Sequence, residues 1–147
     1  MKLEIKHSVV LSRNMEALQD ANMRFILNMG GSRSSKTYSL CQLLIVWCLS
    51  NPKILVSIVR KSFPSLRTSV MRDFISVLKD LDIYEVKNHH KTENIYNFPN
   101  GSSVEFFSVD DEQKLRGRKR NIITRIFNEM DTKSENNALY DNVLIYL

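Results

Sequence analysis

The chain has 147 residues, of which 43% are hydrophobic and 25% charged, and its formal net charge is +5. This length suits one domain with its own core, and the composition excludes a disordered chain. The longest apolar run, residues 43–49, is far shorter than the roughly 20 residues of a membrane-spanning helix, and no secretion signal opens the chain. We therefore expect a cytoplasmic protein without membrane contact, whose basic excess permits an acidic partner such as DNA.

The N-terminal third contains one predicted strand and one predicted helix. Residues 1–23 show no strong periodicity, whereas the apolar run 24–29, which ends before two glycines, predicts a buried strand. Residues 36–50 lack glycine and proline and are apolar almost all round, which predicts a buried helix. Within that helix the Cα atoms of Cys41 and Cys48 would lie on the order of 10 Å apart. That is too far for a disulfide, so we expect reduced core thiols.

Strand and helix patterns continue along the chain. Residues 54–59 are rich in β-branched side chains and predict a second buried strand. A helix should open near Pro64 and bury an apolar stripe made of Val70, Phe74, Val77, Leu78 and Leu81. The neighbouring His89 and His90 have no partner motif for a metal, so a solvated turn is expected there.

A hairpin and a third strand complete the pattern. Residues 95–98 and 103–107 flank the tight-turn dipeptide Asn100-Gly101, which predicts a β-hairpin. Residues 121–127 predict a third core strand, although Thr124 and Arg125 are unusual in a fully buried one. The order of these elements predicts an α/β fold with a mostly parallel sheet flanked by helices and a β-hairpin insertion.

The most informative segment lies between the first strand and the first helix, which is where a phosphate-binding loop belongs. It reads Gly30, Gly31, Ser32, Arg33, Ser34, Ser35, Lys36 and Thr37. Small residues let the backbone turn its N–H groups toward phosphate oxygens, and the helix start adds positive potential. Lys36 would neutralise the β- and γ-phosphates of ATP, and the Thr37 hydroxyl would bind Mg²⁺.

One position departs from the common phosphate-loop pattern. Ser35 stands where a second glycine is usual, and a positive φ at a residue with a Cβ would cost roughly 1–2 kcal/mol. The alternative interpretation of the segment is a polar turn that precedes a helix.

An ATPase also needs oxygen ligands for the metal and a group that orients the attacking water. The predicted strand 121–127 is followed by Asn128 and Glu129. Glu129 is the candidate catalytic base, and the Asn128 side chain is placed to hold Mg²⁺ through a water, with Asp131 as a substitute. The alternative for Glu129 is an ordinary surface carboxylate after a strand.

These segments together resemble the large subunit of phage terminases over roughly residues 22–130. The loop Gly30–Thr37 is similar to that family's Walker A motif, which often carries an arginine and tolerates loss of the last glycine. Residues 59–67 resemble the segment after its second strand, and residues 110–117 resemble the segment before its Walker B strand. Asn128-Glu129 is similar to the acidic end of that strand.

The resemblance implies a P-loop ATPase that uses ATP and Mg²⁺ to pack double-stranded DNA into capsids. Its partners would be the terminase small subunit, the portal protein and further copies of the same chain, and Arg33 would reach the γ-phosphate. The basic run Lys114–Arg120 would either touch a DNA backbone or form a solvated face, which is the commoner outcome.

The chain is shorter than the family pattern. Only 18 residues follow Glu129, and no nuclease or coupling motif is identifiable, so we expect residues 1–147 to be an incomplete, truncated ATPase domain. Two other interpretations stay open, namely a different P-loop nucleotide-binding protein and an inactive prophage remnant.

Overall fold

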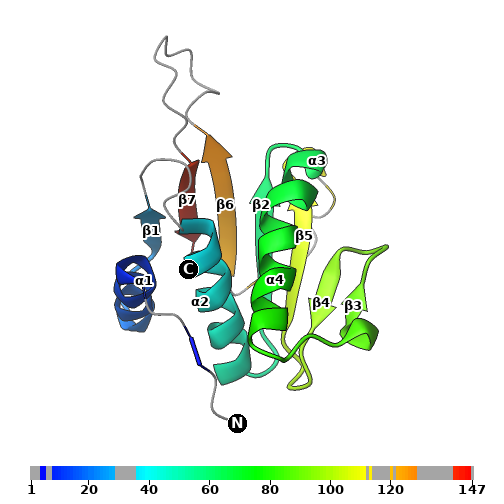
Figure 1. The fold of residues 1–147 in the computed structure, drawn as a ribbon. Coiled ribbons are helices and arrows are strands. Elements are labelled where there is room, and N and C mark those ends of the chain that lie inside the picture. Colours follow the sequence, from blue (N-terminus) through cyan, green and yellow to red (C-terminus); the bar gives the residue numbers. More distant parts are fainter. Residues whose placement is uncertain are drawn as a thin grey trace.

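A computed structural model of the chain describes residues 4–5, 8–28, 36–111, 113, 120, 122–128 and 141–146 (Figure 1). The helices are α1 (Val9–Gln19), α2 (Lys36–Ser50), α3 (Phe63–Leu66), a π-helical turn η1 (Arg67–Met71), α4 (Arg72–Asp80) and a 3₁₀ turn η2 (Val86–Asn88). The strands are β1 (Phe25–Asn28), β2 (Leu55–Arg60), β3 (His89–His90), β4 (Ile95–Asn97), β5 (Ser103–Ser108), β6 (Ile122–Asn128) and β7 (Asp141–Tyr146).

These strands form one sheet in the order β1-β7-β6-β2-β5-β4-β3. Strand β2 runs parallel to both β5 and β6. The pairs β1–β7, β6–β7, β4–β5 and β3–β4 are antiparallel. The α/β expectation is confirmed, but the expected mostly parallel sheet is wrong for the described strands. The reason is that β7 returns antiparallel beside β6, and that β3, β4 and β5 form an antiparallel meander.

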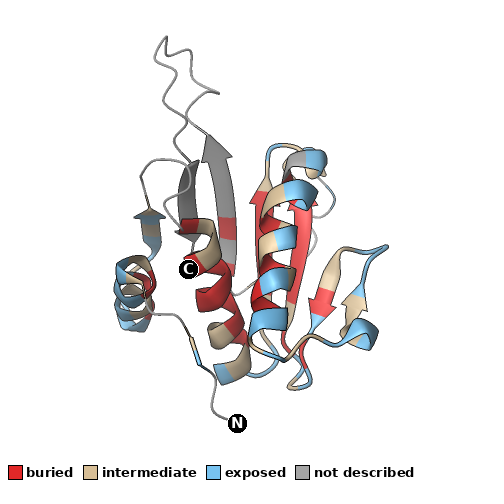
Figure 2. Cartoon of the chain, in the orientation of Figure 1, coloured by how far each residue is buried: buried red, intermediate tan, exposed pale blue. Residues whose placement is uncertain are grey.

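The helices α1, α2 and α4 lie on one face of the sheet (Figure 1). The inward sides of α2 and α4 and the strands beneath them are red in Figure 2, which marks the core. Phe74 of α4 packs edge-on against Phe106 of β5, with ring centroids 5.2 Å apart, and against Tyr96 of β4 at 6.1 Å. The core therefore depends on apolar residues from the predicted helices and strands.

Several predicted elements are confirmed with nearly the expected bounds. Helix α2 begins at Lys36 and ends at Ser50, and β2 is buried along its centre. The helix expected near Pro64 runs through α3, η1 and α4, and it buries Val70 and Phe74 as expected. The predicted hairpin pairs β4 with β5, and its turn contains Gly101 at a φ of +87°, a conformation that favours glycine.

Two expectations are wrong, namely the burial of the first strand and the solvated turn at His89-His90, and one helix was not predicted at all. Strand β1 exists, but it is not buried, since Phe25 is 59% and Leu27 52% exposed at the outer edge of the sheet. Residues 9–19 form α1, which the sequence patterns did not predict. The pair His89-His90 forms the short strand β3 rather than a solvated turn.

Candidate functional site

The predicted phosphate loop is described only at its two ends. Strand β1 ends at Asn28, and Lys36 and Thr37 open the 15-residue helix α2. Residues 30–35, including Arg33, lie outside the described residues, as do Glu129 and Asp131. Asn128 ends β6, and only its backbone is described. The strand-to-helix context expected for a phosphate loop is therefore present on both sides of residues 29–35.

The strand register brings the carboxyl ends of β1 and β6 to one edge of the sheet. Asn28 of β1 lies opposite Val143 of β7, and Val143 lies opposite Ile126 of β6. Because β7 is antiparallel to both neighbours, β1 and β6 run in the same direction. Asn28 and Ile126 therefore lie about 10 Å apart, two strand spacings of about 4.8 Å each, and β6 continues to Asn128. Strands β1 and β6 therefore end at the same edge of the sheet.

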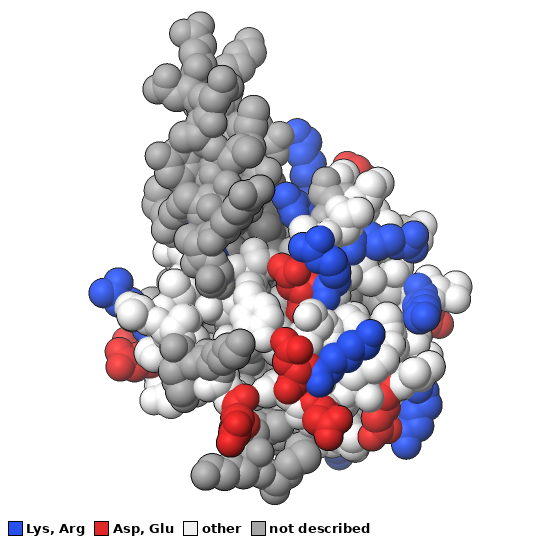
Figure 3. Space-filling model, in the orientation of Figure 1, with Lys and Arg blue, Asp and Glu red and all other residues white. Residues whose placement is uncertain are grey.

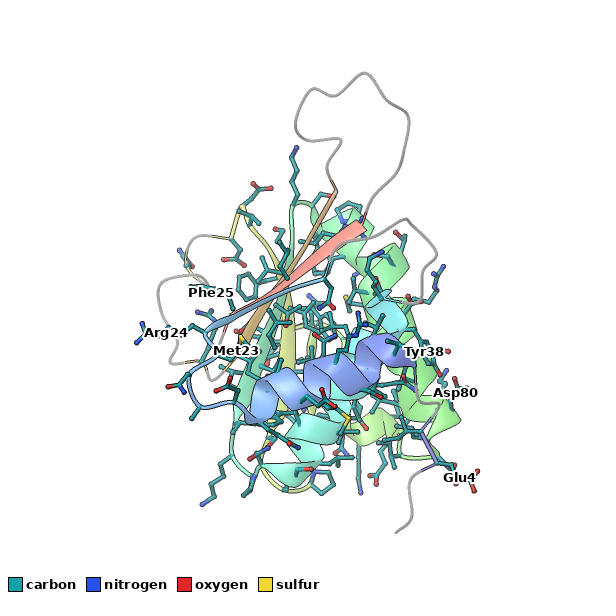
Figure 4. All side chains as sticks on the ribbon, turned by 90° about the vertical axis from the view of Figure 1, so that its left-hand side faces the viewer. Glu4, Met23, Arg24, Phe25, Tyr38 and Asp80 are labelled. Carbon is teal, nitrogen blue, oxygen red and sulfur yellow. The ribbon has the colours of Figure 1, made fainter. Side chains whose placement is uncertain are left out.

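Lys36 and Thr37 are held close to this edge by the start of α2. Lys36 is only 6% exposed, so its aliphatic stem packs inside the protein rather than extending into solvent. Thr37 is half-buried. Tyr38 donates a hydrogen bond of 2.9 Å to Asp80 of α4, which fixes the first turn of α2 against its neighbour (Figure 4). This bond and burial raise the pKa of Tyr38, with burial the larger cause.

Helix α1 anchors the stem of the loop. Asn14 of α1 and Asn28 exchange two amide hydrogen bonds, of 3.0 and 2.9 Å, and Asn14 is buried. The Ser8 hydroxyl caps α1 by accepting from the N–H of Leu11 and also lies 2.7 Å from the Ser39 hydroxyl of α2. Both ends of the predicted loop are thus tied to α1. The sequence patterns missed these residues, and the only local signal was a polar Asn28 at the end of an apolar strand.

Arg60 is a further candidate cation at the same edge. It ends β2, and the register places it opposite Ile126, two residues before the end of β6. The Arg60 guanidinium donates a short hydrogen bond to the Ser69 hydroxyl of η1, which orients the side chain. No motif drew attention to Arg60, because an arginine at the end of a strand is common on a solvated surface.

A buried polar cluster lies on the sheet face that α2 and α4 do not cover. Ser57 and Glu105 are opposite one another in β2 and β5, and their neighbours Val56, Ile58, Val104 and Phe106 face the helices. Arg120 donates from Nε to Glu105 at 3.0 Å and to the Ser57 hydroxyl at 2.7 Å, and Ser57 also donates a short bond to Glu105. The Arg120 guanidinium lies 5.1 Å from the Phe107 ring centroid.

This cluster corrects part of one expectation. The basic run Lys114–Arg120 was expected to be a solvated face or a DNA contact, and Arg120 is neither, since its side chain is 5% exposed and paired with Glu105. Residues 114–119 lie outside the described residues. The two cysteines, by contrast, are as expected, because both are free and buried.

A pocket of 620 Å³ lies at the opposite end of β1 from the predicted loop. Its wall includes Met23 and Arg24, which precede β1, together with Trp47 of α2 (Figure 4). Since β1 runs from Phe25 to Asn28, this pocket lies at the amino end of the strand. It therefore belongs to a different region from the candidate phosphate site.

Among the residues that the structure describes, no group of three or more His, Cys, Asp or Glu side chains could hold a metal ion. No helix in the described part of the chain is long and apolar enough to cross a bilayer.

The chain was also compared with known proteins. Residues 22–145 match the family model described as phage terminase large subunit. No curated protein and no solved structure matches the chain. The family match includes β1, α2, β2, β6 and most of β7, whereas α1 precedes the matched residues.

Proposed function

The chain belongs to the phage terminase large subunit family, and we propose that residues 1–147 form part of the ATP-binding and ATP-hydrolysing domain of its DNA-packaging motor. The observation that carries this proposal is the shared edge of β1 and β6. It supports a P-loop arrangement, because a loop after β1 and a carboxylate after β6 would meet across about 10 Å.

In this proposal the phosphate loop consists of Gly30, Gly31, Ser32, Arg33, Ser34, Ser35, Lys36 and Thr37. The loop amides and the Lys36 ammonium bind the β- and γ-phosphates of ATP, and Arg33 contacts the γ-phosphate. The helix α2 is long enough to present a substantial positive potential at Lys36. The ties from Asn14 and Ser8 hold both ends of the loop before the nucleotide binds, which lowers the ordering cost.

The proposed chemistry is in-line attack of water on the γ-phosphate. Glu129 orients and deprotonates the water, while the Thr37 hydroxyl and Asn128 contribute oxygen ligands for Mg²⁺ or its waters. These oxygens suit a magnesium ion, and they belong to the first turn of α2 and to the last residue of β6. Bound Mg²⁺ would neutralise charge on the β- and γ-phosphates. Double-stranded DNA, the small subunit, the portal protein and further copies of the chain are the proposed partners.

The first test measures the affinity of the purified chain for a fluorescent ATP analogue. Lys36→Ala should weaken binding at least about thirtyfold, because charge-assisted hydrogen bonds contribute about 2 kcal/mol or more. Lys87→Ala is the matched control, since Lys87 is an exposed lysine paired with Glu85. Equal affinity of the Lys36→Ala variant and the native chain would refute the proposed site, provided that circular dichroism shows both folded.

The second test separates binding from turnover. Glu129→Gln should keep the affinity for the analogue and lower the rate of phosphate release by about a hundredfold or more. A native chain that binds nucleotide without turnover would support the inactive-remnant interpretation instead. Turnover that requires a small-molecule phosphate acceptor would indicate a different P-loop enzyme.

A further inference from the structure

A basic groove lies between the helix η1–α4 and the meander of β3 and β4, away from the candidate phosphate site. The groove has a volume of 480 Å³. Its floor includes the apolar side chains of Met71 and Ile75. Basic side chains line it from both sides, namely Arg67, Arg72, Lys79, His89 and Lys91. None of the described residues that line it is acidic.

The π-helical turn explains why two arginines share the groove. In the π-helical turn η1 the backbone hydrogen bonds join residues five apart rather than four, which widens the turn, and Arg67 and Arg72 both line the groove. Lys79 lies two α-helical turns beyond Arg72 and returns to that side. The row from Arg67 to Lys79 covers twelve residues, or about 18 Å along the helix.

The contacts of these cations leave most of their charge available. Arg72 pairs with Asp73 at 3.2 Å, but its side chain is 71% exposed, so the pair contributes little. Arg67 lies 5.4 Å from the ring centroid of Phe63, and Lys79 lies 5.3 Å from that of Tyr84. Contacts with aromatic rings orient a cation without neutralising it. Figure 3 shows blue Lys and Arg side chains gathered around α3 and the upper part of α4.

Two further side chains in the groove indicate a site that suits an anion. Burial lowers the pKa of His89, and the charges of Lys91 and His90 lower it further, so the local potential is positive. The His89 Nδ1 lies 2.9 Å from the Tyr84 hydroxyl, which holds the ring in place. Asn94 has a buried Oδ1 without a hydrogen-bond partner. Rotation of that amide exchanges its oxygen and NH₂, so either a donor or an acceptor is available to a ligand.

We propose that this groove binds the phosphodiester backbone of duplex DNA. A single phosphate would engage only one end of a cationic row of about 18 Å, whereas one DNA strand places a phosphate every 3.4 Å or so along the helix axis. The row therefore matches about five consecutive nucleotides of a backbone. The choice of DNA as the bound polymer rests on the proposed function. The row of basic side chains is observed independently of that proposal.

The test measures anisotropy of a fluorescein-labelled 20-base-pair duplex of random sequence, with the full chain, over a series of KCl concentrations. The triple variant Arg72→Gln, Lys79→Gln, Lys91→Gln should bind at least about tenfold more weakly at about 0.1 M salt. Its plot of log affinity against log salt should be shallower by about 2 to 3 units, about one for each lost phosphate contact.

A matched triple variant controls for net charge. Arg13→Gln, Lys53→Gln, Lys87→Gln removes the same charge from exposed positions outside the groove, and it should stay within about twofold of the native chain. Equal losses in the two triple variants would overturn the proposal, and so would a native chain that does not bind the duplex. Inorganic phosphate that displaces the duplex better than chloride of equal ionic strength would identify a small-anion site instead.

A second readout reports on the groove directly. The NMR titration of the His89 ring should show its pKa rising when the duplex is added, because a phosphate beside the imidazole favours the protonated form. An unchanged His89 pKa at saturating duplex would place the DNA elsewhere. The groove variant should keep its affinity for the ATP analogue, and Lys36→Ala should keep its affinity for DNA. Failure of one proposal is therefore distinguishable from failure of the other.

Discussion

Removal of Arg120 gives a sharp test of the packing on the sheet face that α2 and α4 leave uncovered. Glu105 is 2% exposed, and its carboxylate accepts hydrogen bonds from the Arg120 Nε at 3.0 Å and from the Ser57 hydroxyl. Arg120→Met keeps the apolar stem over Phe107 but removes the charge. The buried Glu105 carboxylate then loses its ion pair with Arg120, which costs about 3–5 kcal/mol. A domain of this size has a free energy of unfolding of about 5–15 kcal/mol, so the loss is a large fraction of the total.

Urea unfolding followed by the fluorescence of Trp47, the single tryptophan, measures this loss. The double variant Glu105→Leu, Arg120→Met removes both charges and should recover most of the stability, because replacing a buried ion pair with apolar groups is often neutral. A loss of less than about 1 kcal/mol in Arg120→Met would refute the reasoning, since it would mean that water reaches Glu105. If the double variant has the same low free energy of unfolding as Arg120→Met, the loss comes from altered packing rather than from the unpaired charge.

Three further predictions concern other buried polar groups. Asn14→Ala removes both amide hydrogen bonds to Asn28, so urea unfolding should show a loss of about 1–3 kcal/mol in the free energy of unfolding. Affinity for the ATP analogue should also fall. Unchanged affinity would show that α1 does not support nucleotide binding. Burial raises the pKa of Cys48 to about 12 and also raises that of Cys41, so both thiols should resist Ellman's reagent at pH 8 until denaturant is added. Because the pKa of His89 is lowered by folding, the unfolded chain binds more protons below pH 6.5 or so. The free energy of unfolding should therefore fall as the pH drops through that range, and His89→Gln should show a smaller fall in the same urea titrations.

Elements with one clear local pattern, such as an unbroken apolar run or a tight-turn dipeptide, were predictable from the sequence. Helix α2 and strand β2 are buried from nearly all sides, so an unbroken apolar run was sufficient to identify them. The hairpin was predictable because Asn100-Gly101 fits a turn with positive φ. In each case the local signal and the tertiary environment agree.

The missed or wrong elements are those in which tertiary contacts override the local signal. Helix α1 buries only Leu11, Asn14 and Leu18, and its central inward residue is polar, so no apolar stripe was visible. Strand β1 is apolar yet exposed, because its position at the sheet edge depends on pairing with β7. The sheet is mixed partly because β7 runs antiparallel to both β1 and β6. No local sequence pattern distinguishes a parallel strand partner from an antiparallel one.

The candidate site also contains some residues that the sequence identified and others that it did not. The residue types of the phosphate loop and of Asn128-Glu129 were readable, because each follows a predicted strand. Their supporting residues were not, since Asn14, Ser39 and Arg60 acquire partners only when distant segments pack together. The same limit applies to Arg120, whose neighbours in the sequence are charged but whose partners lie 15 and 63 residues away.

The position of β7 gives the site a specific structural dependence. Val143 is the single residue between Asn28 and Ile126, so the spacing of the two predicted halves is set by the ladders on either side of β7. Antiparallel ladders are anchored by hydrogen bonds along their whole length, and a shift of one residue would reverse every side chain in β7. The spacing between the ends of β1 and β6, which precede the proposed phosphate loop and Glu129, is consequently set by backbone pairing rather than by side-chain packing. If the proposed site forms at this edge, it should therefore tolerate substitutions on the surface of β7 better than any change in its register.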